Sequence, residues 1–239
     1  MRLQVAISHA GVASRRKAAM LIEAGFVEVN DKIVREKGLA VDPERDRIKV
    51  EGRYLKREAR KVYLLINKPK GVITTASDEK GRKTVLDLLP RIVERLYPVG
   101  RLDKDTTGLL LLTNDGELAY RLTHPSFEVE KIYHVEVKGC ASPQTLEKLR
   151  KGIFVDGKRT LPTSITVLKQ DKRKTILTIK LHEGRKRQVR RMFEVQGHPV
   201  TKLKRVSIGN LKLGELGPGC HRGITREELK KLKTMVGMK

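Results

Sequence analysis

The chain has 239 residues, of which 38% are hydrophobic, enough for one large or two modest domains with packed cores. Its 52 Lys and Arg exceed its 28 Asp and Glu, and the net charge of +24 indicates a polyanionic partner, because these side chains displace counterions from phosphates. No stretch approaches the roughly 20 apolar residues of a membrane span, and residues 1–11 lack a signal-peptide pattern.

The two cysteines, Cys140 and Cys220, lie far apart and lack the spacing of metal ligands. The sequence has six His but no CxxC or HxxxH pair, and it has neither a phosphate loop nor a dinucleotide-binding glycine motif. We therefore expect no metal and no cofactor. A disulfide between the two cysteines stays open, although disulfides are rare in cytoplasmic proteins.

Residues 1–52 have the pattern of a small domain. Ser14 is a natural N-cap for a helix with one apolar face, and Gly25 ends that helix. The dipeptide at residues 30–31 is a hairpin turn signal between two short apolar runs. The expected elements are helices at residues 2–8 and 15–24, a hairpin of strands at 27–29 and 32–34, and a strand at 47–50.

Residues 53–60 are highly charged and nearly free of aliphatic side chains, so we predict a linker there. Residues 61–239 form a second unit in which strands and helices do not alternate regularly. The wholly apolar run at residues 109–112 is typical of a central strand. We predict an α+β fold with a mixed or antiparallel sheet flanked by helices. Strands are expected at 62–66, 109–112, 133–137, 164–168 and 175–181, and helices at 84–89, 115–122 and 187–195, after Pro143, and after the capping box at 225–228.

A polar loop with two carboxylates, Asp103 and Asp105, runs directly into the apolar run. That position places charged groups at the mouth of a core element, where a rigid scaffold can aim them. From the residues alone two interpretations stay open. One is a catalytic carboxylate, and the other is a turn in which an Asp caps the chain and pairs with Arg101.

Four motifs in order resemble the pseudouridine synthases, in the branch that modifies ribosomal RNA as stand-alone proteins. The run GRLD at residues 100–103, followed by TGLL at 107–110, is similar to the signature of that family. Residues 1–52 resemble the small RNA-binding domain first known from a small-subunit ribosomal protein, the S4 type. The other matching runs are NKPKG at 67–71, KIY at 131–133, GRKRQVRRM at 184–192 and GHPV at 197–200.

The resemblance implies roles for three side chains. Asp103 matches the catalytic aspartate, Tyr133 the aromatic residue that stacks on the target base, and Arg190 the basic residue that pairs with the aspartate. Asp105 has no such counterpart and is interpreted as a loop or RNA-facing residue. From the residues alone, Tyr133 is equally well a half-buried strand tyrosine and Arg190 a surface arginine. Candidate apolar walls of the pocket are Val72, Leu102 and Leu181.

The implied reaction breaks the N1–C1′ bond of uridine, turns the uracil and forms a C5–C1′ bond, without redox change or cofactor. The aspartate attacks C1′ or C6, or it removes a sugar proton, and the sequence does not choose between these routes. Each route needs an ionised carboxylate, which a nearby guanidinium favours. The uridine must be flipped out of the stacked RNA to reach the pocket.

Basic side chains are expected to bind the RNA, and a solvated surface face is the competing interpretation for each. At the second helix, backbone amides add to three consecutive basic residues. Asn30 is more simply a turn former. The candidates are Ser14, Arg15, Arg16, Lys17, Asn30, Lys68, Lys70, Arg101, Arg185, Lys186, Arg187 and Arg191.

We expect a monomeric cytoplasmic enzyme that acts on ribosomal RNA, free or in pre-ribosomal particles, and the motifs are closer to the large-subunit type. Competing hypotheses are the same chemistry on small-subunit RNA and a non-catalytic assembly factor that keeps the fold. A membrane-surface protein is disfavoured, because no segment combines a strong apolar face with basic residues.

Overall fold

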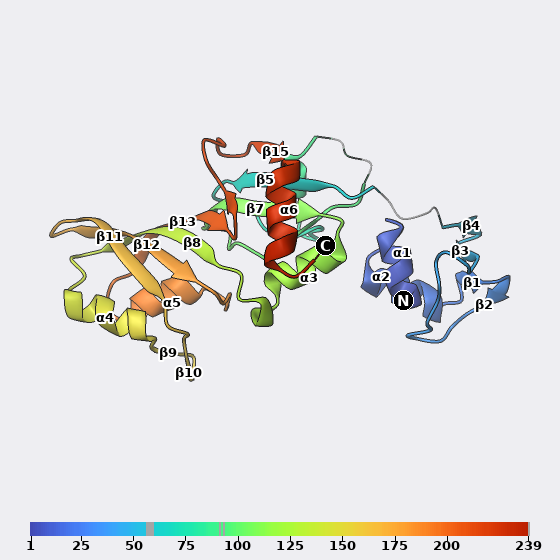
Figure 1. Ribbon diagram of the computed structural model, residues 1–239, viewed down its shortest axis with the longest axis horizontal. Coiled ribbons are helices and arrows are strands. Elements are labelled where there is room, and N and C mark those ends of the chain that lie inside the picture. The colour runs from blue at the N-terminus through green and yellow to red at the C-terminus, as the bar shows by residue number, and fades with distance from the viewer. Residues whose placement is uncertain (56–59, 91, 93, 239) are drawn as a thin grey trace. The chain divides into compact units, whose positions relative to one another are not determined.

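The computed structural model describes residues 1–55, 60–90, 92 and 94–238, and the chain divides into two compact units (Figure 1). The first unit consists of Met1–Val62 with the short segments Arg91–Leu96 and Asn114–Gly116, and the rest forms the second. Each unit has its own hydrophobic core. In the described part of the chain, no helix is long and apolar enough to cross a membrane.

The N-terminal unit combines two helices with a small antiparallel sheet. Ser14 caps the second helix by accepting a hydrogen bond from the Lys17 backbone N–H at 3.1 Å, as predicted. The elements are α1 (Leu3–His9), α2 (Arg15–Glu23), β1 (Val27–Val29), β2 (Lys32–Ile33), β3 (Ile48–Val50) and β4 (Arg53–Tyr54), with the strand order β2-β1-β3-β4. The core that joins helices and sheet includes Leu3, Ile7, Ala18, Ile22, Val27 and Ile48.

The prediction of a linker at residues 53–60 is wrong for residues 53–55. Arg53 and Tyr54 form β4, which pairs with β3, and Leu55 packs on the N-terminal core. The charged residues misled the prediction because β4 is an exposed edge strand, where charged side chains are common. Residues 56–59 of the predicted linker lie outside the described residues.

The larger unit is built on a nine-stranded mixed sheet flanked by helices, which confirms the predicted α+β fold. The order is β11-β12-β8-β13-β7-β5-β15, with β14 beside β13 and β6 beside β7, and β13 runs parallel to β7. The strands are β5 (Tyr63–Lys68), β6 (Tyr97–Pro98), β7 (Thr107–Thr113), β8 (Lys131–Lys138), β11 (Ser164–Gln170), β12 (Lys174–Leu181), β13 (Val200–Ile208), β14 (Leu211–Lys212) and β15 (His221–Gly223), while β9 (Phe154–Val155) and β10 (Lys158–Arg159) form a separate hairpin. The helices are α3 (Gly116–Thr123), α4 (Pro143–Lys151), α5 (Gln188–Val195) and α6 (Arg226–Met235), with single 3-10 turns η1 (Leu86–Leu88) and η2 (Pro125–Phe127).

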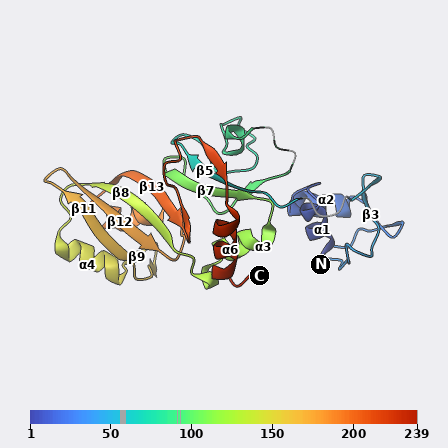
Figure 2. The same ribbon diagram turned by 45° about the horizontal axis from the view of Figure 1, so that its top comes forward.

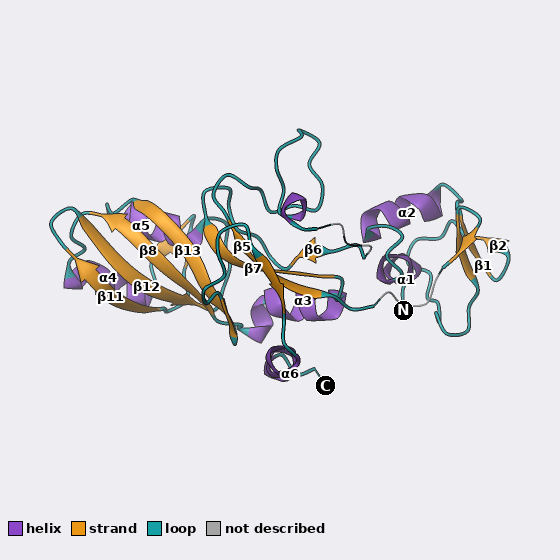
Figure 3. Cartoon of the chain, turned by 90° about the horizontal axis from the view of Figure 1, so that it is seen from above, coloured by secondary structure: helices purple, strands orange, loops and turns teal. Residues whose placement is uncertain are grey.

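Both faces of β7 are buried, which explains the uninterrupted apolar run at residues 109–112. Leu109 and Leu111 pack with α3 and α6 on one face, whereas Leu110 and Leu112 pack with the cluster of Val72 and Leu102 on the other. Figures 2 and 3 show α3 and α6 side by side on one side of these strands, and Figure 3 shows the segment with η1 on the opposite side.

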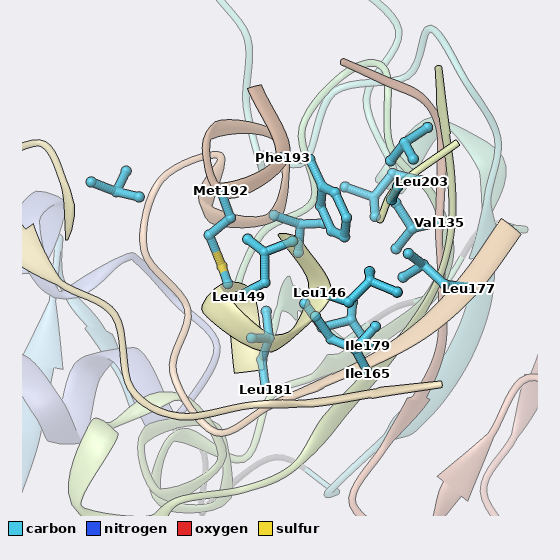
Figure 4. Packing of buried hydrophobic residues seen from close by; sticks show 14 residues of the cluster. Val135, Leu146, Leu149, Ile165, Leu177, Ile179, Leu181, Met192, Phe193 and Leu203 are labelled. Atoms are coloured by element: carbon cyan, nitrogen blue, oxygen red, sulfur yellow. The ribbon is translucent and has the colours of Figure 1, made fainter. Parts of the chain in front are cut away.

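A third cluster covers β8 and β12 beneath α4 and α5 (Figure 4). Burial alternates along β12, as expected of a strand with one packed face, and Leu177, Ile179 and Leu181 lie in this cluster. This packing fixes α5, the helix that carries the basic motif, on the sheet. The labelled members are Val135, Leu146, Leu149, Ile165, Leu177, Ile179, Leu181, Met192, Phe193 and Leu203.

The helix expected at residues 84–89 is wrong, because the structure has only the 3-10 turn η1 there. Thr84 forms an isolated bridge with Ile73, and its N–H and hydroxyl both donate to the Asp87 carboxylate, at 2.7 and 3.0 Å. Pro90 prevents further helical turns, because a proline restricts the residue before it, and Leu89 is extended with ψ of 152°.

Candidate active site

The loop at residues 99–106, between β6 and β7, carries Asp103 and is called the carboxylate loop below. The Thr74 hydroxyl donates to the Leu102 carbonyl at 2.7 Å and accepts from the Leu102 N–H at 3.2 Å. The Thr106 N–H donates to the Asp103 carbonyl at 3.0 Å, which closes a tight turn. The loop therefore presents its carboxylates from a rigid base at the start of a buried strand.

Two arginines at the start of α5 meet the two carboxylates. Arg187 Nη1 lies 3.9 Å from a carboxylate oxygen of Asp103 and 3.4 Å from one of Asp105. Arg190 Nη2 lies 3.1 Å from the Asp105 carboxylate and donates to the Asp105 carbonyl, also at 3.1 Å. The expected pairing of Arg190 with Asp103 is therefore wrong, and Arg187 is the arginine that reaches Asp103.

The difference follows from where the two arginines lie. Arg187 is the exposed N-cap of α5, whereas Arg190 is only 8% exposed and lies on the packed side of the helix. The Arg190 guanidinium also donates to the Val200 carbonyl at 3.2 Å and to the Thr106 hydroxyl at 3.5 Å. Burial lowers the pKa of Arg190, and nearby Asp105 partly offsets this, but a guanidinium stays charged at neutral pH. Arg190 therefore holds the backbone of the carboxylate loop.

Lys68 is fully buried, which corrects its predicted contact with RNA phosphate. Its ammonium group donates to the carbonyls of Pro69 at 3.0 Å, Thr106 at 2.8 Å and Lys104 at 3.5 Å. Burial lowers the pKa of Lys68 to about 8, although Asp105 and Asp103 act in the opposite direction. The buried ammonium ties the loop after β5 to the carboxylate loop.

Tyr133 on β8 is half-buried and packs against the cluster of Leu102 and Val72, and also against the cluster beneath α5. In the sheet it pairs with Arg205 on β13, which in turn pairs with Gly108 on β7. Two strand spacings, about 10 Å, therefore separate Tyr133 from the end of the carboxylate loop. The three side chains predicted to be catalytic lie in one region of the larger unit: Asp103, Tyr133 and Arg190.

Gly108 permits the close approach of β7 and β13 at this point. Its φ is +104°, and a Cβ there would lie 2.2 Å from the Arg205 carbonyl oxygen. Arg205 is 4% exposed, and its Nε donates to the Leu109 carbonyl at 2.8 Å. Of the predicted pocket walls, Val72 and Leu102 share a cluster with Tyr133, while Leu181 belongs to the second cluster that Tyr133 contacts.

The basic side chains predicted to bind RNA differ in their availability. The half-buried Arg185 donates to the carbonyls of Lys158 at 3.2 Å and Arg159 at 2.6 Å, and its Nε donates to Glu183 at 3.0 Å. Arg191 forms an ion pair with Asp156. These two arginines therefore have structural partners. The exposed candidates are Arg15, Arg16, Lys17, Lys70, Arg101, Lys186 and Arg187.

Asn30 and Ser14 also have structural partners within the N-terminal unit. The Asn30 amide donates to the Asp46 carboxylate at 2.9 Å and accepts from the Arg47 N–H at 3.0 Å. Its φ of 52° lies in the left-handed region that turns require. The geometry fits the turn-former interpretation of Asn30, and the Ser14 hydroxyl is used by the cap of α2.

Sequence reasoning missed Arg187 as the partner of Asp103 and missed the structural roles of Lys68 and Arg185. Arg187 lies three residues before Arg190 in the same basic motif, so both arginines are near the start of α5. Lys68 ends a run of buried strand residues and precedes Pro69, a position that indicates burial. No signal in the sequence pointed to the Arg185 contacts, because β9 and β10 were not predicted.

Comparisons with known proteins agree with this geometry. Residues 62–195 match the RNA pseudouridylate synthase family, and residues 1–48 match the S4 domain. The chain is 50% identical over 236 residues to ribosomal large subunit pseudouridine synthase B of Bacillus subtilis, covering 98% of this chain and 96% of that relative. It is 43% identical over 240 residues to an uncharacterized RNA pseudouridine synthase of Aquifex aeolicus, covering 100% of this chain and 96% of that relative.

A solved pseudouridylate synthase has the same fold, with a TM-score of 0.71 and 31% identity over 97% of this chain and 99% of that one. Fold and site together define an RNA-modifying isomerase with an appended RNA-binding domain. The chain belongs to the RNA pseudouridylate synthase family, which confirms the resemblance seen in its motifs.

Proposed function

We propose that the chain converts one or more uridines of large-subunit ribosomal RNA to pseudouridine, with Asp103 as the catalytic carboxylate. The observation that carries this proposal is the Asp103 carboxylate facing the Arg187 guanidinium, at the mouth of a buried strand, in a pseudouridylate synthase. The large subunit is proposed from the name of the Bacillus subtilis relative, which is 50% identical to this chain.

The reaction exchanges one bond to the sugar for another. The N1–C1′ bond of uridine breaks, the uracil turns in the pocket, and a C5–C1′ bond forms, while N1 gains a proton and C5 loses one. Asp103 acts in its ionised form, by attack at C1′ or C6 or by removal of a sugar proton. The Arg187 guanidinium places a positive charge 3.9 Å from that carboxylate.

Arg190 and Lys68 act on the loop, not on the substrate. Arg190 holds the Asp105 backbone and carboxylate, and Lys68 holds the carbonyls of residues 104 and 106. Together they keep Asp103 in one orientation, which catalysis by a positioned group requires. Tyr133 receives the flipped uracil on its ring, and one base–aromatic stack contributes roughly 1–3 kcal/mol.

The S4 domain anchors the RNA in this proposal, with residues 1–52 as the binding domain and 61–239 as the catalytic domain. Support comes from the first turn of α2, where the side chains of Arg15, Arg16 and Lys17 are exposed. The N-terminal end of a helix also favours an anion. Phosphates of the RNA outside the target nucleotide are the proposed ligands.

The proposed substrate leads to an oligomeric state and a cellular location for the reaction. We propose that the chain acts as a monomer in the cytoplasm, on ribosomal RNA or on pre-ribosomal particles. Sedimentation of the purified chain with and without a ribosomal RNA transcript tests the monomer, and a complex with two protein copies would contradict it.

Mapping of pseudouridines in ribosomal RNA tests the function. Ribosomal RNA from cells that lack this protein is treated with carbodiimide and read by primer extension. We expect the loss of one or a few stops in large-subunit RNA, restored by the wild-type gene and not by Asp103→Asn. If pseudouridines were lost only from small-subunit RNA, the substrate would be small-subunit RNA instead. An unchanged map would contradict the enzyme activity.

A further inference from the structure

We propose that the β9–β10 hairpin and the adjoining face of α5 form a second RNA-contact surface, on which Phe154 stacks against an unstacked base near the target uridine. The inference rests on the proposed function, because the RNA that it binds is the one that carries the substrate. It adds a further RNA contact to the S4 domain and to the site of Asp103 and Tyr133.

An open cavity of about 330 Å³ lies between the hairpin and α5. At its edges the Phe154 ring is 68% exposed and Val195 is 61% exposed. Single exposed apolar side chains are common, so exposure alone carries no conclusion. An exposed ring beside a hollow is, however, the arrangement on which unstacked bases bind. The residues that line the cavity, called the hairpin surface below, are Phe154, Val155, Asp156, Arg191, Glu194 and Val195.

The hairpin is held rigidly, so Phe154 is presented in one place. Asp156 and Gly157 at its tip have φ values of 51° and 74°, which fit a two-residue hairpin turn. At its base, the Thr160 N–H donates to the Ile153 carbonyl at 2.8 Å. A Cβ at Gly152 would lie 2.3 Å from the Thr160 carbonyl oxygen, which shows how closely the two ends approach. A preordered platform loses less entropy when a base binds.

The hairpin surface is connected directly to the candidate active site. Arg185 donates to two carbonyls of β10, and Arg187, two residues later, faces the carboxylates of Asp103 and Asp105. Arg191 and Val195 are four residues apart and share one side of α5, which begins directly after Arg187. A strand whose uridine enters the site can thus reach Phe154 with a neighbouring nucleotide. Figure 1 shows the hairpin projecting beside α5.

The charge around the hairpin surface favours a nucleic acid over an apolar peptide. Residues 151–159 and 183–195 contain eight Lys or Arg and three Asp or Glu, and Arg185, Arg190 and Arg191 among them already have partners within the chain. Lys151, Lys158 and Lys186 are exposed among them. Exposed cations beside an exposed ring match an RNA strand, whose phosphates bind the cations and whose bases bind the ring. The cavity lining itself includes Glu194 and Asp156, the latter paired with Arg191, so it disfavours a phosphate and leaves room for an uncharged base.

Binding measurements with full-length variants test this surface. The probe is a large-subunit ribosomal RNA transcript, bound at a fixed salt concentration by wild type, Phe154→Ala, Phe154→Tyr and Phe154→Leu. We expect the Kd to rise about tenfold for Phe154→Ala and Phe154→Leu, and to stay within about twofold for Phe154→Tyr, because a stack requires the ring. Leu168→Ala, at a 55% exposed apolar residue of β11, is the matched control with an unchanged Kd.

The outcomes separate the surface from the reaction. An unchanged Kd for Phe154→Ala would overturn the proposal and assign the hairpin surface to a protein partner or to solvent. Recovery of binding by Phe154→Leu would overturn the stacking contact, because an aliphatic side chain cannot supply one. Product formation by wild type on the same transcript is measured in parallel, and its absence would refute the proposed function without altering the binding result.

Discussion

Arg190 and Asp105 are joined twice, through the carboxylate at 3.1 Å and through the backbone carbonyl at 3.1 Å. Asp105 lies inside the turn that the Asp103 carbonyl and the Thr106 N–H close. The pair therefore fixes the turn that presents Asp103. Arg187, on the exposed side, supplies the positive charge that faces Asp103. The two arginines thus have different roles, one in holding the loop and one in its electrostatics.

Arg190→Lys is expected to lower the free energy of unfolding by roughly 2–3 kcal/mol. A lysine cannot keep the contacts with Asp105, Val200 and Thr106 at the same time, so buried acceptors lose their donors. Urea unfolding measures the change. Arg187→Lys, at an exposed position, is the control and should change the free energy by less than about 0.5 kcal/mol. Equal losses for the two variants would contradict the assigned roles.

Lys68 gives a pH dependence with a defined sign. Its pKa is about 8 in the folded chain against an ordinary value of 10.5, so the unfolded chain holds the proton more tightly between these values. Stability therefore rises with pH across this window. Relative to Lys68→Met, the free energy of unfolding of wild type should increase by about 2 kcal/mol from pH 8 to pH 10. A difference that stays flat would show that Lys68 is not a buried cation.

The double variant Arg15→Ala with Arg16→Ala should weaken RNA binding and reduce its dependence on salt. Each lost phosphate contact lowers the slope of log K against log salt by about 0.7–0.9. Filter binding at several salt concentrations measures the slope, and the single-turnover rate at saturating RNA should stay unchanged. Arg45→Ala, an exposed arginine elsewhere in the same unit, serves as the control. An unchanged slope would remove the start of α2 from the RNA contact.

Patterns that are local in the sequence predicted the fold well. The apolar run at residues 109–112 is a strand buried on both faces, and the capping box at Thr225 and Glu228 begins α6. The strand β13 was not predicted, because its exposed Lys202 and Lys204 give it the charge of a surface loop. Its place in the centre of the sheet depends on pairing with β8 and β7, which no single segment reveals.

The sequence predicted which residues belong to the candidate site better than it predicted the contacts between them. The motifs pointed to Asp103, Tyr133 and Arg190, and the fold brings them into one region. Which arginine meets which carboxylate depends on the turn at residues 103–106 and on the packed side of α5, and both are properties of the assembled unit. Lys68 shows the same limit, since a lysine in a basic chain is usually exposed and this one is buried.

Single-turnover conversion by Asp103→Asn and Asp105→Asn tests the central claim most directly. Both variants remove one carboxylate from the same loop, and RNA binding of each should stay close to wild type. Asp103→Asn should also melt like wild type, whereas Asp105→Asn should melt at a lower temperature, because the buried Arg190 loses its carboxylate partner. We predict that Asp103→Asn lowers the rate at saturating RNA by more than about a thousandfold, while Asp105→Asn still forms product at a measurable rate. Full activity of Asp103→Asn, or loss of product with Asp105→Asn alone, would contradict the account.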